Sequence, residues 1–221
     1  MSNALLVTEI KQLIKQIKSK NMNNQYHYII DKSGSMSNCQ KETIDGINEQ
    51  FNSLRKLALE ERDQTFKASL HLFNSQLFNI CSDQRPEHLQ NIAMNEYCPS
   101  GSTSLYDAIG IVASAERVKS ATDVKEGTKK VVFVILTDGY ENSSNLFNFD
   151  TIRKLISDMQ DEVYIFLFLG AIIDAKDVAE KMNIKKENAH SFLKEEMKET
   201  FSKMSLSLEN LAKEKEDWSK F

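Results

Sequence analysis

Asp31, Ser33 and Ser35 stand at alternate positions within residues 26–37, with Gly34 between the two serines. A carboxylate and two hydroxyls offer only oxygen atoms, which are the ligands that a hard divalent cation prefers. A run of aromatic and β-branched residues ends at Asp31, which predicts a buried strand followed by a tight loop. These three groups alone would leave the shell of a cation incomplete, and whether distant parts of the chain supply further ligands depends on the rest of the sequence.

Two further loops have the composition of ligand loops. Asp138 and Gly139 closely follow the apolar run 131–136, and Thr103 lies just before a predicted helix. Of the seven glycines in the chain, three lie in these two loops and the Asp31 loop, where glycine permits sharp turns and close approach of the backbone. If the strands before Asp31 and Asp138 are neighbours in a parallel sheet, both carboxylates lie at the same edge of that sheet.

The hydrophobic pattern predicts the elements that position these loops. Continuous apolar runs at 131–136 and 163–169 are typical of parallel strands buried on both faces. Residues 65–73 and 76–81 flank the polar turn Asn74-Ser75 and predict a β-hairpin. The other predicted strands cover 26–31 and 189–192, and the predicted helices cover 40–61, 86–94, 105–121, 150–160, 175–182 and 194–218.

The alternation of strands and helices after the hairpin predicts an α/β fold. We expect a doubly wound, Rossmann-like, mostly parallel six-stranded sheet with one antiparallel edge strand and helices on both faces. Before it, Leu6, Ile10, Leu13 and Ile17 form one stripe of a helix, and the polar residues 21–25 interrupt that pattern. The predicted organisation is therefore an N-terminal amphipathic helix with a linker over residues 1–24 and one domain over residues 25–221.

Composition limits the classes of partner. The chain has 221 residues, 41% of them hydrophobic, and its net charge of −4 gives no electrostatic reason to expect binding to nucleic acid or to an anionic membrane. Cys39, Cys81 and Cys98 are odd in number and form no CxxC pair, which favours a reducing, cytoplasmic location over a disulfide scaffold. Four lysines between positions 11 and 20 interrupt the N-terminus, so we expect neither a signal peptide nor a membrane span.

The three loops together resemble the metal-ion-dependent adhesion site (MIDAS) of von Willebrand factor type A domains. Asp31-Lys32-Ser33-Gly34-Ser35 matches the DxSxS motif, Thr103 matches the site threonine, and Asp138 in Thr137-Asp138-Gly139 matches the second aspartate. The resemblance covers about residues 25–211, and its short motifs look most similar to compact intracellular bacterial or phage versions.

The resemblance implies a role for each of the five residues. Ser33 and Ser35 would bind the cation directly, and Thr103 would bind it directly or through water. Asp31 and Asp138 would act largely through bound waters. Mg2+ is the expected cation, with Mn2+ and Ca2+ as alternatives, and a Glu or Asp of a partner protein would complete its shell.

The sequence is compatible with three functions. The leading hypothesis is a non-enzymatic, metal-dependent protein-binding module. A metal-dependent phosphohydrolase is the first alternative, because Asp31 at a strand end resembles an aspartyl-phosphate nucleophile, although Ser33 replaces the usual second acid and the chain has no GxxxxGK[ST] motif. The second alternative is an assembly subunit, in which the stripe of the N-terminal helix forms a homo-oligomer instead of packing within the molecule.

Several neighbouring residues have open roles. We expect Asp107 either to support Thr103 or to occupy an ordinary first-turn position of a helix, and Ser33 and Ser35 to be candidate helix caps as well as ligands. His27 and His71 are predicted to be core or sheet-surface residues. The expected rim of the site, with candidate contacts to a partner, consists of Lys32, Met36, Tyr106, Tyr140, Glu141 and Asn142.

Overall fold

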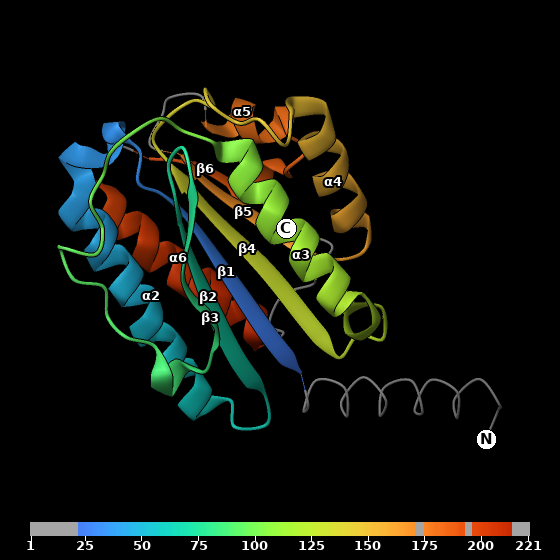
Figure 1. The fold of residues 1–221 in the computed structure, drawn as a ribbon. Helices are drawn as coiled ribbons and strands as arrows, with labels where there is room; N and C mark the ends of the chain where they lie inside the picture. The colour runs from blue at the N-terminus through green and yellow to red at the C-terminus, as the bar shows by residue number, and fades with distance from the viewer. Residues whose placement is uncertain (1–21, 171–174, 193–195, 214–221) are drawn as a thin grey trace, which may run out of the picture.

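The computed structural model describes residues 22–170, 175–192 and 196–213. These residues form a six-stranded sheet with the strand order β3-β2-β1-β4-β5-β6 (Figure 1). Neighbouring strands are parallel except for β2 and β3, which form the antiparallel hairpin at one edge. The fold class predicted from the sequence is confirmed. The strands are β1 (Asn23–Asp31), β2 (Thr65–Phe73), β3 (Leu77–Gln84), β4 (Lys129–Thr137), β5 (Ile165–Gly170) and β6 (Ala189–Ser191).

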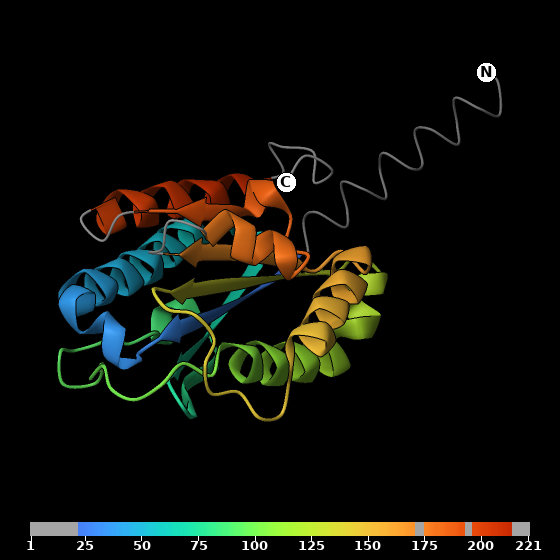
Figure 2. The ribbon, with the colours of Figure 1, turned by 90° about the horizontal axis from the view of Figure 1, so that it is seen from above.

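Helices cover both faces of the sheet (Figure 2). The helices α2 (Gln40–Glu60) and α6 (Met197–Ala212) pack on one face, where they meet Tyr28 and Ile30 of β1. The opposite face, which includes Ile29, is covered by α3 (Leu105–Lys125), α4 (Phe149–Asp161) and α5 (Ala175–Lys181). Successive side chains of a strand point to opposite faces, so this double cover explains why β1 and β4 are continuously buried.

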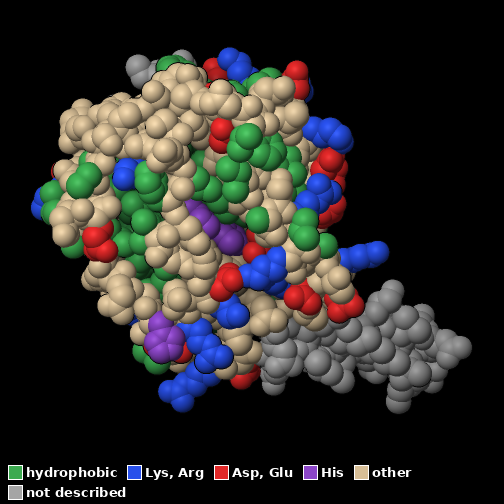
Figure 3. All heavy atoms as spheres, viewed as in Figure 1, with side chains coloured by type: hydrophobic (Ala, Val, Ile, Leu, Met, Phe, Trp, Pro, Cys, Tyr) green, Lys and Arg blue, Asp and Glu red, His purple; other side chains and the backbone are tan. Residues whose placement is uncertain are grey.

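The outer surface of the α3 face carries basic and acidic side chains intermixed (Figure 3). No helix among the described residues has both the length and the apolar composition needed to cross a membrane.

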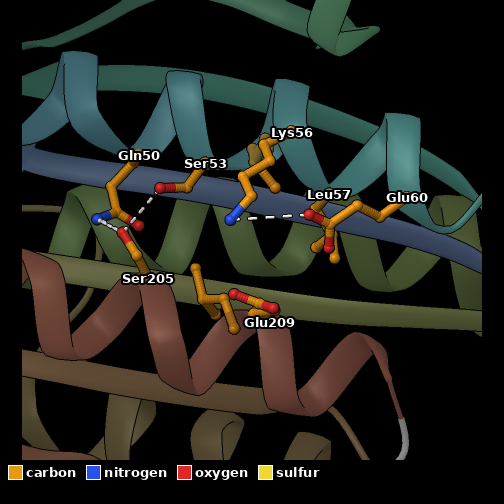
Figure 4. Close-up of a pocket in the computed structure, with 9 residues that line it drawn as sticks. Gln50, Ser53, Lys56, Leu57, Glu60, Ser205 and Glu209 are labelled. Carbon is orange, nitrogen blue, oxygen red and sulfur yellow. Dashed lines mark hydrogen bonds and ion pairs between the residues drawn. The ribbon is translucent and has the colours of Figure 1, made fainter.

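The helices α2 and α6 also contact each other on the face of the sheet opposite α3. The stripe predicted in the last helix is buried there, and Gln50 of α2 donates to the backbone oxygen of Phe201 at 2.8 Å and to Ser205 Oγ at 2.7 Å. Figure 4 shows these polar side chains lining a small cavity of about 70 Å³ between the two helices. The α6 stripe therefore packs within the molecule.

The predicted helix at 86–94 is wrong. Only Pro86–His88 forms a short 3-10 turn, and the chain then runs irregularly. Asn48 of α2 accepts a hydrogen bond from Ile92 N at 2.8 Å and donates one to Ile92 O at 3.1 Å. These side-chain bonds satisfy backbone groups that a helix would otherwise satisfy internally.

Other boundaries also differ from the predictions. α3 continues to Lys125 because buried Val124 lies within a stretch that looks polar in the sequence. β1 begins at Asn23, which pairs with both Thr65 and Lys129, so part of the expected linker belongs to the sheet. Val163 lies before β5, in a turn with a φ of 66°. The predicted N-terminal helix and the two ends of the last predicted helix, 194–195 and 214–218, lie outside the described residues.

Candidate metal centre

The site lies where the strand order of the sheet reverses. The chain passes from β1 through α2 to β2 on one side, and α3 later carries it to β4 on the other side of β1. β1 and β4 are parallel neighbours in which Ile30 pairs with Leu136, so Asp31 at the end of β1 and Asp138 just after β4 lie at adjacent strand ends. Ligand sites of doubly wound sheets lie at such reversal points, outside the carboxyl ends of the strands.

Asp31 is fixed by three hydrogen bonds. Its Oδ1 accepts from Ser33 N at 2.7 Å, and its Oδ2 accepts from Thr137 Oγ1 at 2.6 Å. The hydroxyl of Tyr97, a fully buried residue, donates to the backbone oxygen of Asp31. Burial raises the pKa of the Asp31 carboxyl, the hydrogen bonds from Thr137 and Ser33 oppose that rise, and the charge of Asp138 adds to it. A nearby cation would stabilise the charged form of this buried group.

A chain of hydrogen-bonding contacts links the two aspartates, and it begins with the bond from Ser33 N to Asp31 Oδ1. Ser33 Oγ lies 3.1 Å from Ser35 Oγ, and Ser35 Oγ donates to Asp138 Oδ1 at 2.6 Å. Asp31, Ser33 and Asp138 are buried, whereas Ser35 is exposed. The polar cluster therefore reaches the molecular surface at Ser35.

Thr103 borders the same cluster on the far side of Gly139. A Cβ atom built on Gly139 would lie 3.3 Å from Thr103 Oγ1 and 3.4 Å from Ser35 Oγ. Glycine at this position therefore leaves room for both hydroxyls. The structure thus brings together all five residues proposed from the sequence, in a region built from three separate loops.

The Thr103 loop is tied to the Asp31 loop by backbone bonds. Gly34 N donates to Gly101 O at 3.0 Å, and Ser100 N donates to Lys32 O at 2.8 Å. Gly101 has a φ of 78°, the left-handed conformation that glycine adopts without strain. Asn74, in the turn between β2 and β3, donates from Nδ2 to Ser100 O at 2.8 Å. Sequence reasoning assigned Asn74 only to a turn, because such a long-range bond has no local signature.

The residues expected at the rim have varied positions. Met36 is fully buried, Tyr140 is exposed, and Lys32 Nζ lies 4.3 Å from the ring centre of Phe78. Asn142 accepts a hydrogen bond from the backbone of Thr103, and Glu141 accepts one from Tyr106 N in the first turn of α3. Ser33 precedes the 3-10 turn Gly34–Cys39 but makes no capping bond with its side chain.

Asp107 occupies the first turn of α3, which is one of the two expectations, but its side chain has a further role. Its carboxylate accepts hydrogen bonds from three consecutive backbone N–H groups of the loop after Asp138. It therefore holds that loop, and no hydrogen bond between its side chain and Thr103 is found among the described residues.

The donor set fits a hard divalent cation. It consists of three hydroxyls and two carboxylates, all of them oxygen donors. Within residues 22–170, 175–192 and 196–213, no group of three or more His, Cys, Asp or Glu side chains could hold a metal ion. The candidate centre is a hydroxyl-rich cluster of a different composition.

The sequence of this fold matches a known protein family. Residues 27–206 match the von Willebrand factor type A (VWA) domain. The chain belongs to the VWA family. The match includes all five residues of the candidate centre, and VWA domains typically mediate metal-dependent protein interactions. A search of curated protein sequences finds no match.

Solved structures share the fold of this VWA domain at low sequence identity. The pilus adhesin SpaC from Lactobacillus rhamnosus GG has a TM-score of 0.65 at 11% identity, over 86% of this chain and 30% of the adhesin. The vWF domain of the type V pili tip protein Mfa5 from Porphyromonas gingivalis has a TM-score of 0.65 at 9% identity, over 85% of this chain and 95% of that domain.

A third similar structure is described with a metal. Proximal thread matrix protein 1 from the mussel byssus, with a zinc-occupied MIDAS motif, has a TM-score of 0.60 at 13% identity, over 84% of this chain and 48% of that protein. The VWA domain described here thus spans less than half the length of the byssus protein and about a third of the adhesin SpaC. At these low identities the likeness shows the common fold alone, and the three neighbours are a pilus adhesin, a pilus tip protein and a byssus thread matrix protein.

Proposed function

We propose that this VWA domain binds a divalent cation through a MIDAS formed by Asp31, Ser33, Ser35, Thr103 and Asp138, and that the cation recruits a Glu or Asp of a partner protein. The observation that carries the proposal is the hydrogen-bonded chain from buried Asp31 through the backbone N–H and hydroxyl of Ser33 and the hydroxyl of Ser35 to Asp138, which reaches the surface at Ser35. A bound cation would supply a positive centre for the partner's carboxylate, and charge-assisted contacts of this kind give orientation and specificity.

Mg2+ is the cation that we propose, with Mn2+ and Ca2+ as alternatives. Mg2+ keeps several water ligands and is typically held by few protein groups, which suits a cluster with two direct serine ligands. The aspartates would then hold the water ligands and balance the charge of the cation.

The proposed role is binding and not catalysis. Ser33 occupies the position where an aspartyl-phosphate enzyme would carry its second acid, and its backbone N–H is already bonded to Asp31. The serine cannot act as a general acid in the way that a carboxylic acid does. We further propose that residues 25–221 form the binding domain, of the compact intracellular type, because its free cysteines suit a reducing cytoplasm.

Isothermal titration with MgCl2 tests the cation site. Wild type should show saturable binding, and Ser35→Ala and Asp138→Ala should each weaken it strongly. Ser37→Ala is the matched control, because this exposed hydroxyl lies two residues further along the same loop and donates to Gly34 O. Equal binding by wild type and Asp138→Ala, or no saturable binding by wild type, would rule out the proposed site.

A pull-down from cell extract tests recruitment of a partner. A protein retained by wild type in Mg2+, released by EDTA and lost with Asp138→Ala supports the proposal. Metal-dependent hydrolysis of p-nitrophenyl phosphate that disappears in Asp31→Asn would instead favour the phosphohydrolase.

A further inference from the structure

Thr103 is held in place by a residue from the loop that carries Asp138. Thr103 N donates to Asn142 Oδ1 at 2.9 Å, and Asn142 N donates to Thr103 O at 3.0 Å. Both backbone polar groups of the threonine are thus bonded to one residue that follows Asp138 by four positions. The position of one proposed ligand is therefore set by the loop of another.

The helix that begins after Thr103 depends on the same loop. The first N–H groups of a helix have no partner within the helix, and Ser104 at the N-cap of α3 makes no capping bond with its side chain. Glu141 Oε2 instead accepts from Tyr106 N at 2.9 Å, and Ser144 Oγ accepts from Asp107 N at 3.0 Å. The cap of α3 thus comes from a segment more than thirty residues away in the sequence.

The helix in turn supports the loop. Asp107 in the first turn of α3 accepts from Asn145 N and Leu146 N at 2.9 Å and from Phe147 N at 2.8 Å. Glu141 completes the arrangement by accepting from two N–H groups of its own loop, at 2.8 and 2.7 Å. Each partner contributes a carboxylate to the other's backbone, and hydrogen bonds to charged groups are stronger than neutral ones. The start of α3 and the loop after β4 therefore form one mutually capped unit.

We propose that Asn142 is a positioning residue that fixes the Thr103 hydroxyl relative to the Asp138 carboxylate before a cation binds. Glu141 and Asp107 hold the start of α3 and the loop after β4 at the distance that lets Asn142 bond to Thr103. The inference rests on the proposed cation site and assigns to Asn142 an inward role that differs from contact with a partner. A site whose ligands are already positioned loses less free energy to ordering when it binds.

Cation titration of matched variants tests the effect on binding. Asn142→Ala should weaken Mg2+ binding by about 10–100-fold, the range seen when a group that orients a metal ligand is removed. Asn142→Asp keeps the acceptor oxygen and should restore most of the affinity. Asn145→Ala is the control from the same loop, because its side chain donates to Ser143 O and its backbone bond to Asp107 remains. This control should bind like wild type.

The two hydrogen bonds between Asn142 and the backbone of Thr103 form a clamp on Thr103. Amide hydrogen exchange in cation-free protein measures whether this clamp protects the Thr103 amide. The Thr103 amide should exchange faster in Asn142→Ala than in wild type, Asn142→Asp and Asn145→Ala, while the amides of β4 remain protected. A merely structural loss of stability would accelerate the β4 amides as well. Unchanged exchange at Thr103 would overturn the clamp whether or not the protein binds a cation.

The titration distinguishes loss of the Asn142 contact from absence of the cation site. If Asn142→Ala binds Mg2+ like wild type while Thr103→Ala has lost binding, the site stands and the inference is overturned. If wild type binds no cation, or binds it no better than Thr103→Ala and Asp138→Ala, the proposed function itself fails.

Discussion

At the scale of single residues, a small side chain is as important to the candidate centre as its oxygen donors. Gly139 separates Thr103 from Ser35, and a Cβ at this position would lie within 3.4 Å of both hydroxyl oxygens. Gly34 faces a less crowded region, where a Cβ would meet only Gly101 O at 3.5 Å, an ordinary contact distance. The two glycines of the centre thus differ in how much space their surroundings leave.

Gly139→Ala should weaken Mg2+ binding without unfolding the protein. The added methyl group would press on Thr103 Oγ1 and Ser35 Oγ, and a displaced ligand loses coordination geometry. We expect the dissociation constant for Mg2+ to rise by about tenfold, comparable to the loss of an orienting contact. Titration of Gly139→Ala beside Gly34→Ala measures the effect, and equal affinities in the two variants would contradict it.

At the scale of elements, the approach of α2 to α6 depends on Gly46. A Cβ on Gly46 would lie 2.0 Å from Cδ2 of Phe201, a ring that is itself buried in the core. The two helices can pack at this distance only because Gly46 has no side chain. α2 begins directly after the loop that carries Ser33 and Ser35, so this contact anchors the helix that follows the site.

Gly46→Ala should destabilise the fold, although alanine is the better helix former by about 1 kcal/mol. Overfilling a packed core typically costs about 1–3 kcal/mol, and strain against Phe201 should outweigh the helical preference. Urea unfolding measures the free energy difference. A second change, Phe201→Leu, should recover part of the loss in the double variant because the smaller side chain leaves space. A Gly46→Ala protein as stable as wild type would show that the helices move apart without cost.

At the scale of the whole molecule, a buried polar network crosses the α3 face of the sheet. His27 Nδ1 lies 3.3 Å from His71 Nε2, and His27 Nε2 lies 3.3 Å from a carboxylate oxygen of Glu116, which also pairs with Lys129. Burial and the neighbouring His27 lower the pKa of His71 to about 4. Burial raises the pKa of Glu116, but hydrogen bonds from His27 and Lys129 and the electrostatic effects of the same two residues together outweigh burial and bring the pKa to about 2.

The stability of the protein should therefore fall in acid, first through His71. Between its ordinary pKa of 6.5 and its folded pKa of about 4, the unfolded chain binds a proton that the folded protein does not. The free energy of unfolding should fall over this window by up to about 3 kcal/mol, at about 1.36 kcal/mol per pKa unit. Below the ordinary pKa of 4.5 of Glu116, the stability from its charged form is lost as well.

Urea unfolding from pH 7 to pH 4 isolates the contribution of His71. The stability of wild type relative to His71→Gln should fall as the pH decreases from 7 to 4, because only wild type carries the buried imidazole. The same comparison for His88→Gln, a change at an exposed histidine, should stay constant. A pH-independent difference for His71→Gln would mean that the buried imidazole takes up its proton without cost.

The sequence alone determined the strands and the five candidate ligands. Asp31 ends a continuous apolar run, which predicts a strand, and Ser33 and Ser35 follow it with the spacing of a known motif. The run and the motif each lie within a short stretch of sequence, so both can be recognised without the fold. Buried parallel strands such as β4 are also recognisable, because their burial on both faces leaves an unbroken hydrophobic run. The predicted helix at 86–94 failed because side chains of α2 satisfy its backbone groups from outside the segment.

Only the tertiary structure decided which groups hold the candidate ligands in place. It placed β1 beside β4, turned Asp107 to the loop after Asp138, and bonded Asn142 to both backbone groups of Thr103. Asp107 and Asn142 read in the sequence as an ordinary first-turn acid and an ordinary rim residue. Hydrophobic periodicity and turn preference act between residues close in the chain, whereas these caps and clamps join residues more than thirty positions apart and leave no local pattern.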